Sequence, residues 1–184
     1  MPRRKTKRKQ NVVEIAGLVG IGLFVVGIIW LAFFTQPQIP GNPNQTTTQL
    51  LAPDFTLTDI DGNLFKLSAN KGKVVVLEFM RTTCSACVSE APSLRDLRTK
   101  FGSNVAMVSV SVDPTGDTND VLRGFRDQNM KGWTLIRDTA RVYDEYSVTA
   151  TPTLIIIDKD GYVRFRHVGV TDSSVLMSEI SSLV

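Results

Sequence analysis

The chain has 184 residues, enough for one ordinary domain with an appendage, and its 42% apolar and 21% charged residues are typical of a globular protein. Its net charge of +3 is the sum of two unlike regions. Residues 1–10 hold six basic and no acidic side chains, whereas residues 35–184 hold 15 basic and 17 acidic ones. Because the basic excess is confined to one end, we read it as a topology signal and predict no nucleic-acid partner.

An uncharged, proline-free apolar run, Ala16 to Phe34, follows the basic segment. Its 19 residues approach the roughly 20 that cross a bilayer as a helix. A cleaved signal peptide is the alternative, but its apolar core is typically about 7–15 residues and ends in small residues, whereas this run ends in aromatic ones. We therefore predict a basic cytoplasmic segment over 1–11 and a transmembrane anchor over 12–34. The positive-inside rule then places the remaining chain outside the cytoplasm, in a single-pass protein of the cell membrane.

Residues 35–49 are rich in Pro, Asn, Gln and Thr without apolar periodicity, which predicts a semi-extended linker to a domain over 50–184. That domain opens with two short alternating runs around Asp61-Gly62, a dipeptide that favours a tight hairpin turn. The next element, 73–80, is an almost unbroken apolar run, typical of a central strand covered on both faces.

The rest of the domain alternates between helical and strand-like patterns. We expect strands over 105–112, 153–158 and 162–168, and helices over 84–101, 118–128, 139–146 and 171–183. Thr82 or Thr83 would cap the first helix, while Val121, Leu122 and Phe125 would face inward from the second. This order predicts an α/β fold with a mixed central β-sheet flanked by helices.

The only two cysteines, Cys84 and Cys87, lie where the 73–80 run gives way to the first helix. A structural disulfide usually closes a long loop, and a four-residue ring restricts the unfolded chain very little. The pair therefore indicates a reversible, redox-active disulfide rather than two inert cysteines. Cys84, at the helix N-terminus, is the predicted nucleophile because the helix dipole favours its thiolate, and Cys87 would be the resolving thiol.

This cysteine motif, together with Thr151-Pro152-Thr153 before the next-to-last strand, resembles the thioredoxin superfamily. Within it, the sequence looks like the membrane-anchored TlpA-like and ResA-like branch, grouped with the redoxins and related to AhpC/TSA proteins. The segments that carry the resemblance are 52–57, 73–79, 84–92, 146–153 and 157–161. It implies a thioredoxin-like fold and a thiol-disulfide oxidoreductase with no cofactor beyond the Cys84–Cys87 disulfide. Thr83 and Ala86 replace the tryptophan and proline usual in the family, which leaves the direction of electron flow open.

Two glutamates are further candidates for catalytic roles. Glu78 is an acid in a strand covered on both faces, where a carboxylate needs a partner or a proton. The resemblance implies that Glu78 exchanges a proton with Cys87, and the alternative is an outward-facing glutamate or one in a salt bridge with Lys73 or Arg81. Glu90 shares a helical face with Cys87 and matches a glutamate of the ResA-like branch, with a solvated helix glutamate as the alternative.

Thr151 and Pro152 resemble the cis-proline loop that faces the disulfide and binds the substrate backbone. The resemblance thus implies partners that are thiols or disulfides of exported proteins, such as apocytochromes c. Electrons would come from a membrane thiol carrier, because the sequence has no flavin or nicotinamide motif.

Two other functions belong to the same superfamily. A thiol peroxidase needs threonine three residues and proline seven residues before its cysteine, where this chain has Arg81 and Leu77. An SCO-like copper chaperone uses Cys-x-x-x-Cys and a histidine in another loop, whereas the single histidine here, His167, falls in a predicted strand. We therefore predict no metal site and expect disulfide exchange.

Overall fold

The computed structural model describes residues 50–184. The predicted cytoplasmic segment (1–11), transmembrane anchor (12–34) and linker (35–49) lie outside the described residues. Within residues 50–184, no helix has both the length and the apolar character needed to cross a bilayer.

A five-stranded mixed sheet forms the centre of the domain, as predicted. Its strands are β3 (Val74–Met80), β4 (Val105–Ser111), β5 (Thr134–Arg137), β6 (Thr153–Ile157) and β7 (Val163–Val168). They lie in the order β5-β4-β3-β6-β7, with β3, β4 and β5 mutually parallel and β6 antiparallel to both β3 and β7. The predicted hairpin is a separate antiparallel pair, β1 (Thr56–Thr58) and β2 (Leu64–Lys66).

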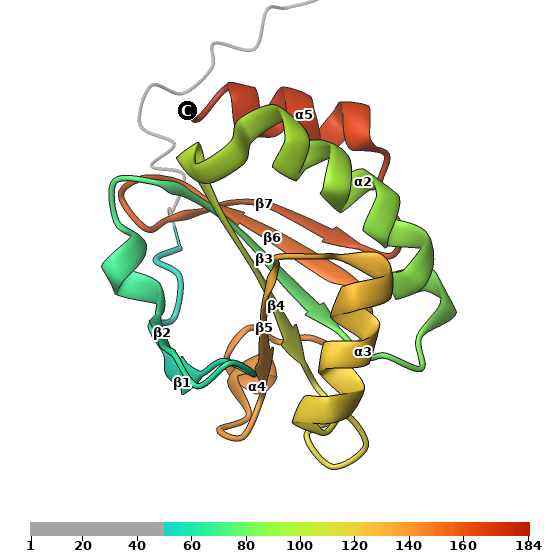
Figure 1. Cartoon of the computed structure of the whole chain (residues 1–184). Coiled ribbons are helices and arrows are strands. Elements are labelled where there is room, and N and C mark those ends of the chain that lie inside the picture. Colours follow the sequence, from blue (N-terminus) through green and yellow to red (C-terminus); the bar gives the residue numbers. More distant parts are fainter. Residues whose placement is uncertain (1–49) are drawn as a thin grey trace, which may run out of the picture. The chain divides into compact units, whose positions relative to one another are not determined.

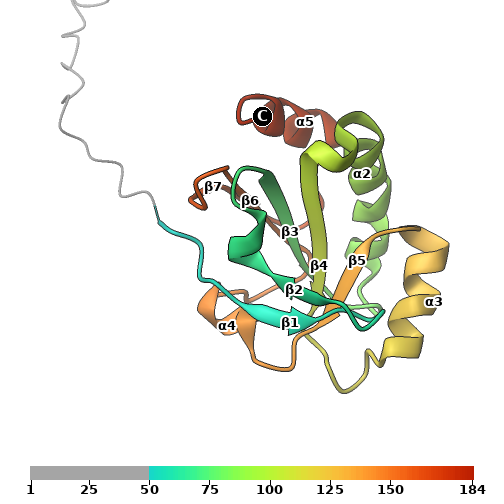
Figure 2. The same ribbon diagram turned by 60° about the vertical axis from the view of Figure 1, so that its left-hand side comes forward.

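Helices cover both faces of the sheet. The α-helices are α2 (Ser85–Phe101), α3 (Asn119–Asn129), α4 (Val142–Glu145) and α5 (Ser173–Ser181), and the 3-10 turns are η1 (Leu67–Asn70) and η2 (Gly102–Asn104). The longest helix, α2, lies side by side with α5 over one face, while α4 and the β1-β2 hairpin lie toward the other (Figures 1 and 2).

All seven residues of β3 are buried, so this strand contributes to two apolar clusters on opposite faces. Val76 and Met80 pack in the cluster that includes Leu94 and Leu97 of α2. The alternate residues pack in the second cluster, with Phe55 and Tyr146. Because side chains alternate along a strand, Glu78 shares the face of Val76 and Met80 and points toward α2. The fold therefore places a carboxyl group inside an apolar layer, directly beneath the helix that carries the cysteines.

Four local details differ from the sequence-based expectations. β5 was not predicted, although it is hydrogen-bonded beside β4. The residue that caps α2 is Cys84, not a threonine. Val121 is 44% exposed, because Leu122 and Phe125 alone define the inner face of α3. The predicted helix 139–146 is a single turn, α4.

Candidate active site

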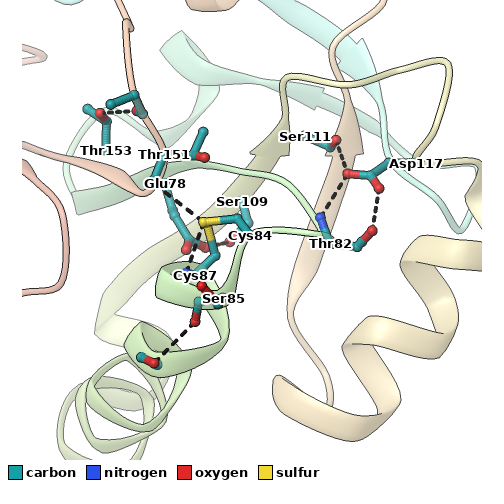
Figure 3. The surroundings of a disulfide bond; sticks show 12 residues. Glu78, Thr82, Cys84, Ser85, Cys87, Ser109, Ser111, Asp117, Thr151 and Thr153 are labelled. Atoms are coloured by element: carbon teal, nitrogen blue, oxygen red, sulfur yellow. Dashed lines mark hydrogen bonds between the residues drawn. A yellow bond between two sulfur atoms is a disulfide. The ribbon is translucent and has the colours of Figure 1, made fainter.

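Cys84 and Cys87 form a disulfide at the start of α2, with Cα atoms 5.2 Å apart (Figure 3). Cys84 has extended backbone angles, and its Sγ accepts the backbone N–H of Cys87 at 3.1 Å, as a helix-capping side chain does. Cys84 is partly exposed, whereas Cys87 is 1% exposed and belongs to the apolar cluster under α2. A bulky disulfide from another protein can therefore reach only Cys84.

The N-terminus of α2 favours negative charge on Cys84. Its first turn contains no acidic residue, so the positive end of the helix dipole is not neutralised there. Both this dipole and the Cys87 N–H group stabilise a thiolate at Cys84, which is the form that attacks disulfides.

The loop before β6 faces the disulfide. The Thr151–Pro152 bond is cis, and the carbonyl oxygen of Thr151 lies 3.4 Å from Cys84 Sγ. The loop is held by hydrogen bonds from Thr153 Oγ1 to the Ala150 carbonyl and from the Gly169 N–H to the Pro152 carbonyl, both 2.8 Å long. The structure thus places Thr151 beside Cys84, and the role of Thr151 and Pro152 in binding the substrate backbone stays a prediction.

A cleft of about 250 Å³ continues from Thr151 along this loop. It is lined by Arg81, Val112, Tyr143, Val148, Thr149, Ala150 and Thr151. Arg81 is the one charged side chain in this lining, and its carbonyl accepts the N–H of Cys84 at 3.2 Å. The cleft is thus connected to the disulfide through Thr151, which lines it and whose carbonyl lies beside Cys84 Sγ.

Glu78 is 1% exposed and its carboxyl group accepts a hydrogen bond from Ser109 Oγ on the neighbouring strand (Figure 3). Burial raises the pKa of Glu78 to about 7, with a further contribution from the negative charge of Glu90, while the Ser109 hydroxyl opposes the rise. The alternative of an ion pair with Lys73 or Arg81 is wrong. Ser109 forms this contact because it is the direct partner of Glu78 in the β3-β4 register.

Glu90 is fully buried, so the alternative of a solvated helix glutamate is also wrong. Its Oε2 accepts the backbone N–H of Thr171 at 2.7 Å, and its Oε1 is buried without a hydrogen-bond partner among residues 50–184. Burial raises the pKa of Glu90, while the Thr171 N–H and the charge of His167 act in the opposite direction. Two buried carboxyl groups with raised pKa values therefore lie on the face of the sheet that α2 covers, the helix that carries the disulfide.

Asp117, in the loop between β4 and α3, holds the chain just before Cys84. This 2% exposed carboxylate accepts the Thr82 N–H at 3.1 Å, the Thr82 hydroxyl, and the Ser111 hydroxyl at 2.5 Å (Figure 3). Sequence analysis missed this residue, because an aspartate in a Pro, Gly and Thr-rich loop is typical of an ordinary turn.

His167 makes its contact away from the cysteines: its Nε2 lies 2.8 Å from Glu179 Oε2 on α5. Within residues 50–184, no three His, Cys, Asp or Glu side chains are grouped so that they could hold a metal ion.

Known proteins resemble this chain in sequence and in fold. The model of the AhpC/TSA family matches residues 49–166. The thioredoxin-like protein YneN of Bacillus subtilis (strain 168) is 30% identical over 118 residues, which cover 64% of this chain and 69% of YneN. The thiol-disulfide oxidoreductase ResA of Bacillus cereus is 32% identical over 120 residues, which cover 64% of this chain and 68% of ResA.

Among solved structures, the DsbE-type thiol:disulfide interchange protein of Chlorobium tepidum matches with a TM-score of 0.66 at 28% identity. The match covers 73% of this chain and 96% of that protein. The chain therefore belongs to the AhpC/TSA family and is a ResA-like thiol-disulfide oxidoreductase of the thioredoxin superfamily.

Proposed function

We propose that the protein reduces disulfides of exported proteins, such as apocytochromes c, from a membrane tether. The Cys84 thiolate attacks a target disulfide, which forms a mixed disulfide and releases one target thiolate. The Cys87 thiolate then attacks Cys84 Sγ, releases the second target thiolate and closes the Cys84–Cys87 disulfide. Two electrons pass from the cysteine pair to the target, and the protons of the two thiols go to the released thiolates or to solvent.

One observation carries this proposal: the asymmetry of exposure between the two cysteines at the start of α2. The partly exposed Cys84 lies at the helix N-terminus with its sulfur beside the Thr151 carbonyl, and the buried Cys87 is bonded to it. An attacking thiol must meet an outside partner, whereas a resolving thiol needs access only to its neighbour. In this reaction Thr151 and Pro152 would bind the substrate backbone along the adjoining cleft.

Glu78 is suited to accept the proton of Cys87. Its carboxyl group lies on the same face of the sheet as Cys87, and in Figure 3 it points toward the cysteine pair. With a pKa of about 7, it can both take up and release a proton near neutral pH. Glu90 would adjust this exchange, since its negative charge raises the pKa of Glu78.

The other parts of the proposal rest on the sequence. The basic segment and the apolar run over 16–34 support a cytoplasmic N-terminus and an extracytoplasmic domain. In that compartment a membrane-embedded thiol carrier is the reductant we propose, and it would reopen the Cys84–Cys87 disulfide after each cycle.

A trapping experiment in cells tests the oxidoreductase. With Cys87→Ser the mixed disulfide at Cys84 cannot be resolved, so target proteins should remain attached to the variant and separate from it on reduction. The Cys84→Ser, Cys87→Ser double variant is the control and should trap nothing. Equal recovery from both variants would contradict the proposal.

A peroxidase is the second candidate, because the AhpC/TSA family model matches this domain. Purified protein with a thiol reductant should therefore be assayed in parallel for peroxide consumption and for reduction of a disulfide-bonded protein. We expect disulfide reduction that requires both cysteines, since Arg81 and Leu77 replace the threonine and proline a peroxidase needs. Peroxide consumption at a comparable rate would favour the second candidate.

A further inference from the structure

A row of polar side chains crosses the sheet on the face beneath α2. In the strand register Glu78 lies opposite Ser109 on one side and opposite Leu154 on the other, and Leu154 lies opposite His167. Directly opposed residues share a face, and neighbouring strands are about 4.8 Å apart. His167 is thus in line with Glu78, two strands away, with only Leu154 between them.

Glu90 reaches this row from α2. It is fully buried, its charge acts on Glu78, and the charge of His167 acts on it. One of its oxygens is bonded to the Thr171 N–H, and the other has no partner among residues 50–184. Since burying a carboxylate without a counter-charge is costly, the source of positive charge at this position decides whether Glu90 is ionised.

Within residues 50–184, His167 is the one cation whose charge acts on Glu90. β3 contributes Glu78, β7 contributes His167, and α5 contributes Glu179, which lies behind the imidazole at 2.8 Å. Asp172, which begins α5, is exposed and bonded to Ser174. The side chains of His167 and Glu179 are 22% and 18% exposed, so solvent water contacts the imidazole, whereas Glu90 is fully buried.

We propose that His167, oriented by Glu179, is a positioning residue that supplies the counter-charge for the buried carboxylate of Glu90 and thereby couples the acid pair beside the disulfide to solvent pH. A histidine gains its proton between about pH 5 and 8. The protonated ring favours ionised Glu90, and ionised Glu90 favours a proton on Glu78. This inference deepens the proposed function, because Glu78 is the group that we expect to accept the proton of Cys87.

The test is a carboxyl ¹³C NMR titration of Glu90 in the oxidised full-length protein in detergent micelles. In His167→Gln the amide can still bond to Glu179 but carries no charge. We expect this change to raise the pKa of Glu90 by about 1, which makes it a tenfold weaker acid. Arg166→Gln is the matched control, because Arg166 bonds to the Tyr146 carbonyl on the other face of the sheet. It should leave the Glu90 titration unchanged.

An unchanged Glu90 titration in a folded His167→Gln protein would overturn the inference, as would an equal change in Arg166→Gln. If His167→Gln does not fold, the wild-type protein decides: the Glu90 carboxyl carbon should respond when the His167 ring loses its proton, and a Glu90 titration with no such response would reject the coupling. These measurements need no substrate. A negative titration result would therefore reject the role of His167 but not the proposed function. A negative trapping result would reject the proposed function but not the coupling between His167 and Glu90.

Discussion

At the scale of single residues, Glu78 combines a structural cost with a chemical use. Its carboxyl group is buried with a pKa of about 7, whereas in the unfolded chain a glutamate ionises near 4.5. Between these two values the unfolded chain has lost a proton that the folded protein keeps. The free energy of unfolding therefore falls as the pH rises from about 4.5 to about 7, and it levels off above that range.

Glu78→Gln should remove this decline, because an amide does not ionise. We expect the variant to gain up to about 3 kcal/mol relative to wild type between pH 5 and pH 8, measured by urea unfolding with the disulfide intact. The same change should slow resolution of the mixed disulfide, since Cys87 loses its proton acceptor. Exposed Glu145→Gln is the control. Parallel pH curves for wild type and Glu78→Gln would show that burial does not perturb this carboxyl.

At the scale of elements, the reactive end of α2 is fixed from outside the helix. Asp117 accepts three hydrogen bonds that connect the β4-α3 loop to Thr82 and to Ser111. Thr82 precedes Cys84 by two residues, so the position of the attacking sulfur depends on a loop 35 residues further along the chain.

Asp117→Asn should loosen this connection, because an amide nitrogen cannot accept the bonds that a carboxylate oxygen accepts. We predict a loss of about 1–3 kcal/mol in the free energy of unfolding, as buried donors lose their acceptor. We also predict slower reaction of reduced Cys84 with a small disulfide, measured by stopped-flow. Asp120→Asn, at a 93% exposed side chain on α3, should change neither quantity. A variant with wild-type stability and rate would remove Asp117 from the site.

The sequence predicts the elements whose signals are long and local. The runs at 73–80 and 105–112 are each eight residues long and mostly apolar, so both central strands could be placed. β5 has only two buried residues, Leu135 and Ile136. A run of this length is too short to show the alternation of apolar and polar residues that predicts a strand. The sequence could not predict the burial of Glu90 either, because the group that hydrogen-bonds to it is a backbone N–H 81 residues away.

At the scale of the whole molecule, the parallel strands β3 and β4 and the α2 crossover bring the cysteines to one end of the sheet, beside the loop before β6. Only one of the two sulfurs is accessible there. This asymmetry, together with the predicted topology, determines how the protein should react in intact cells.

Cys87→Ser leaves Cys84 as the sole thiol of the chain, and Cys84→Ser leaves the buried Cys87. A membrane-impermeant maleimide added to intact cells should label the first variant rapidly and the second slowly, read as a mass shift on gels. Labelling of Cys87→Ser only after the cells are lysed would place the domain in the cytoplasm. Similar labelling rates for both variants would contradict the difference in accessibility.

The capping bond of α2 also affects how variants of this site are interpreted. The atom that attacks disulfides is the atom that accepts the Cys87 N–H, so reactivity and helix initiation reside in one sulfur. Serine at position 84 abolishes the chemistry but keeps an oxygen that can take over the bond, whereas alanine removes both. An inactive alanine variant would thus confound lost nucleophilicity with an unravelled first turn, and serine separates the two.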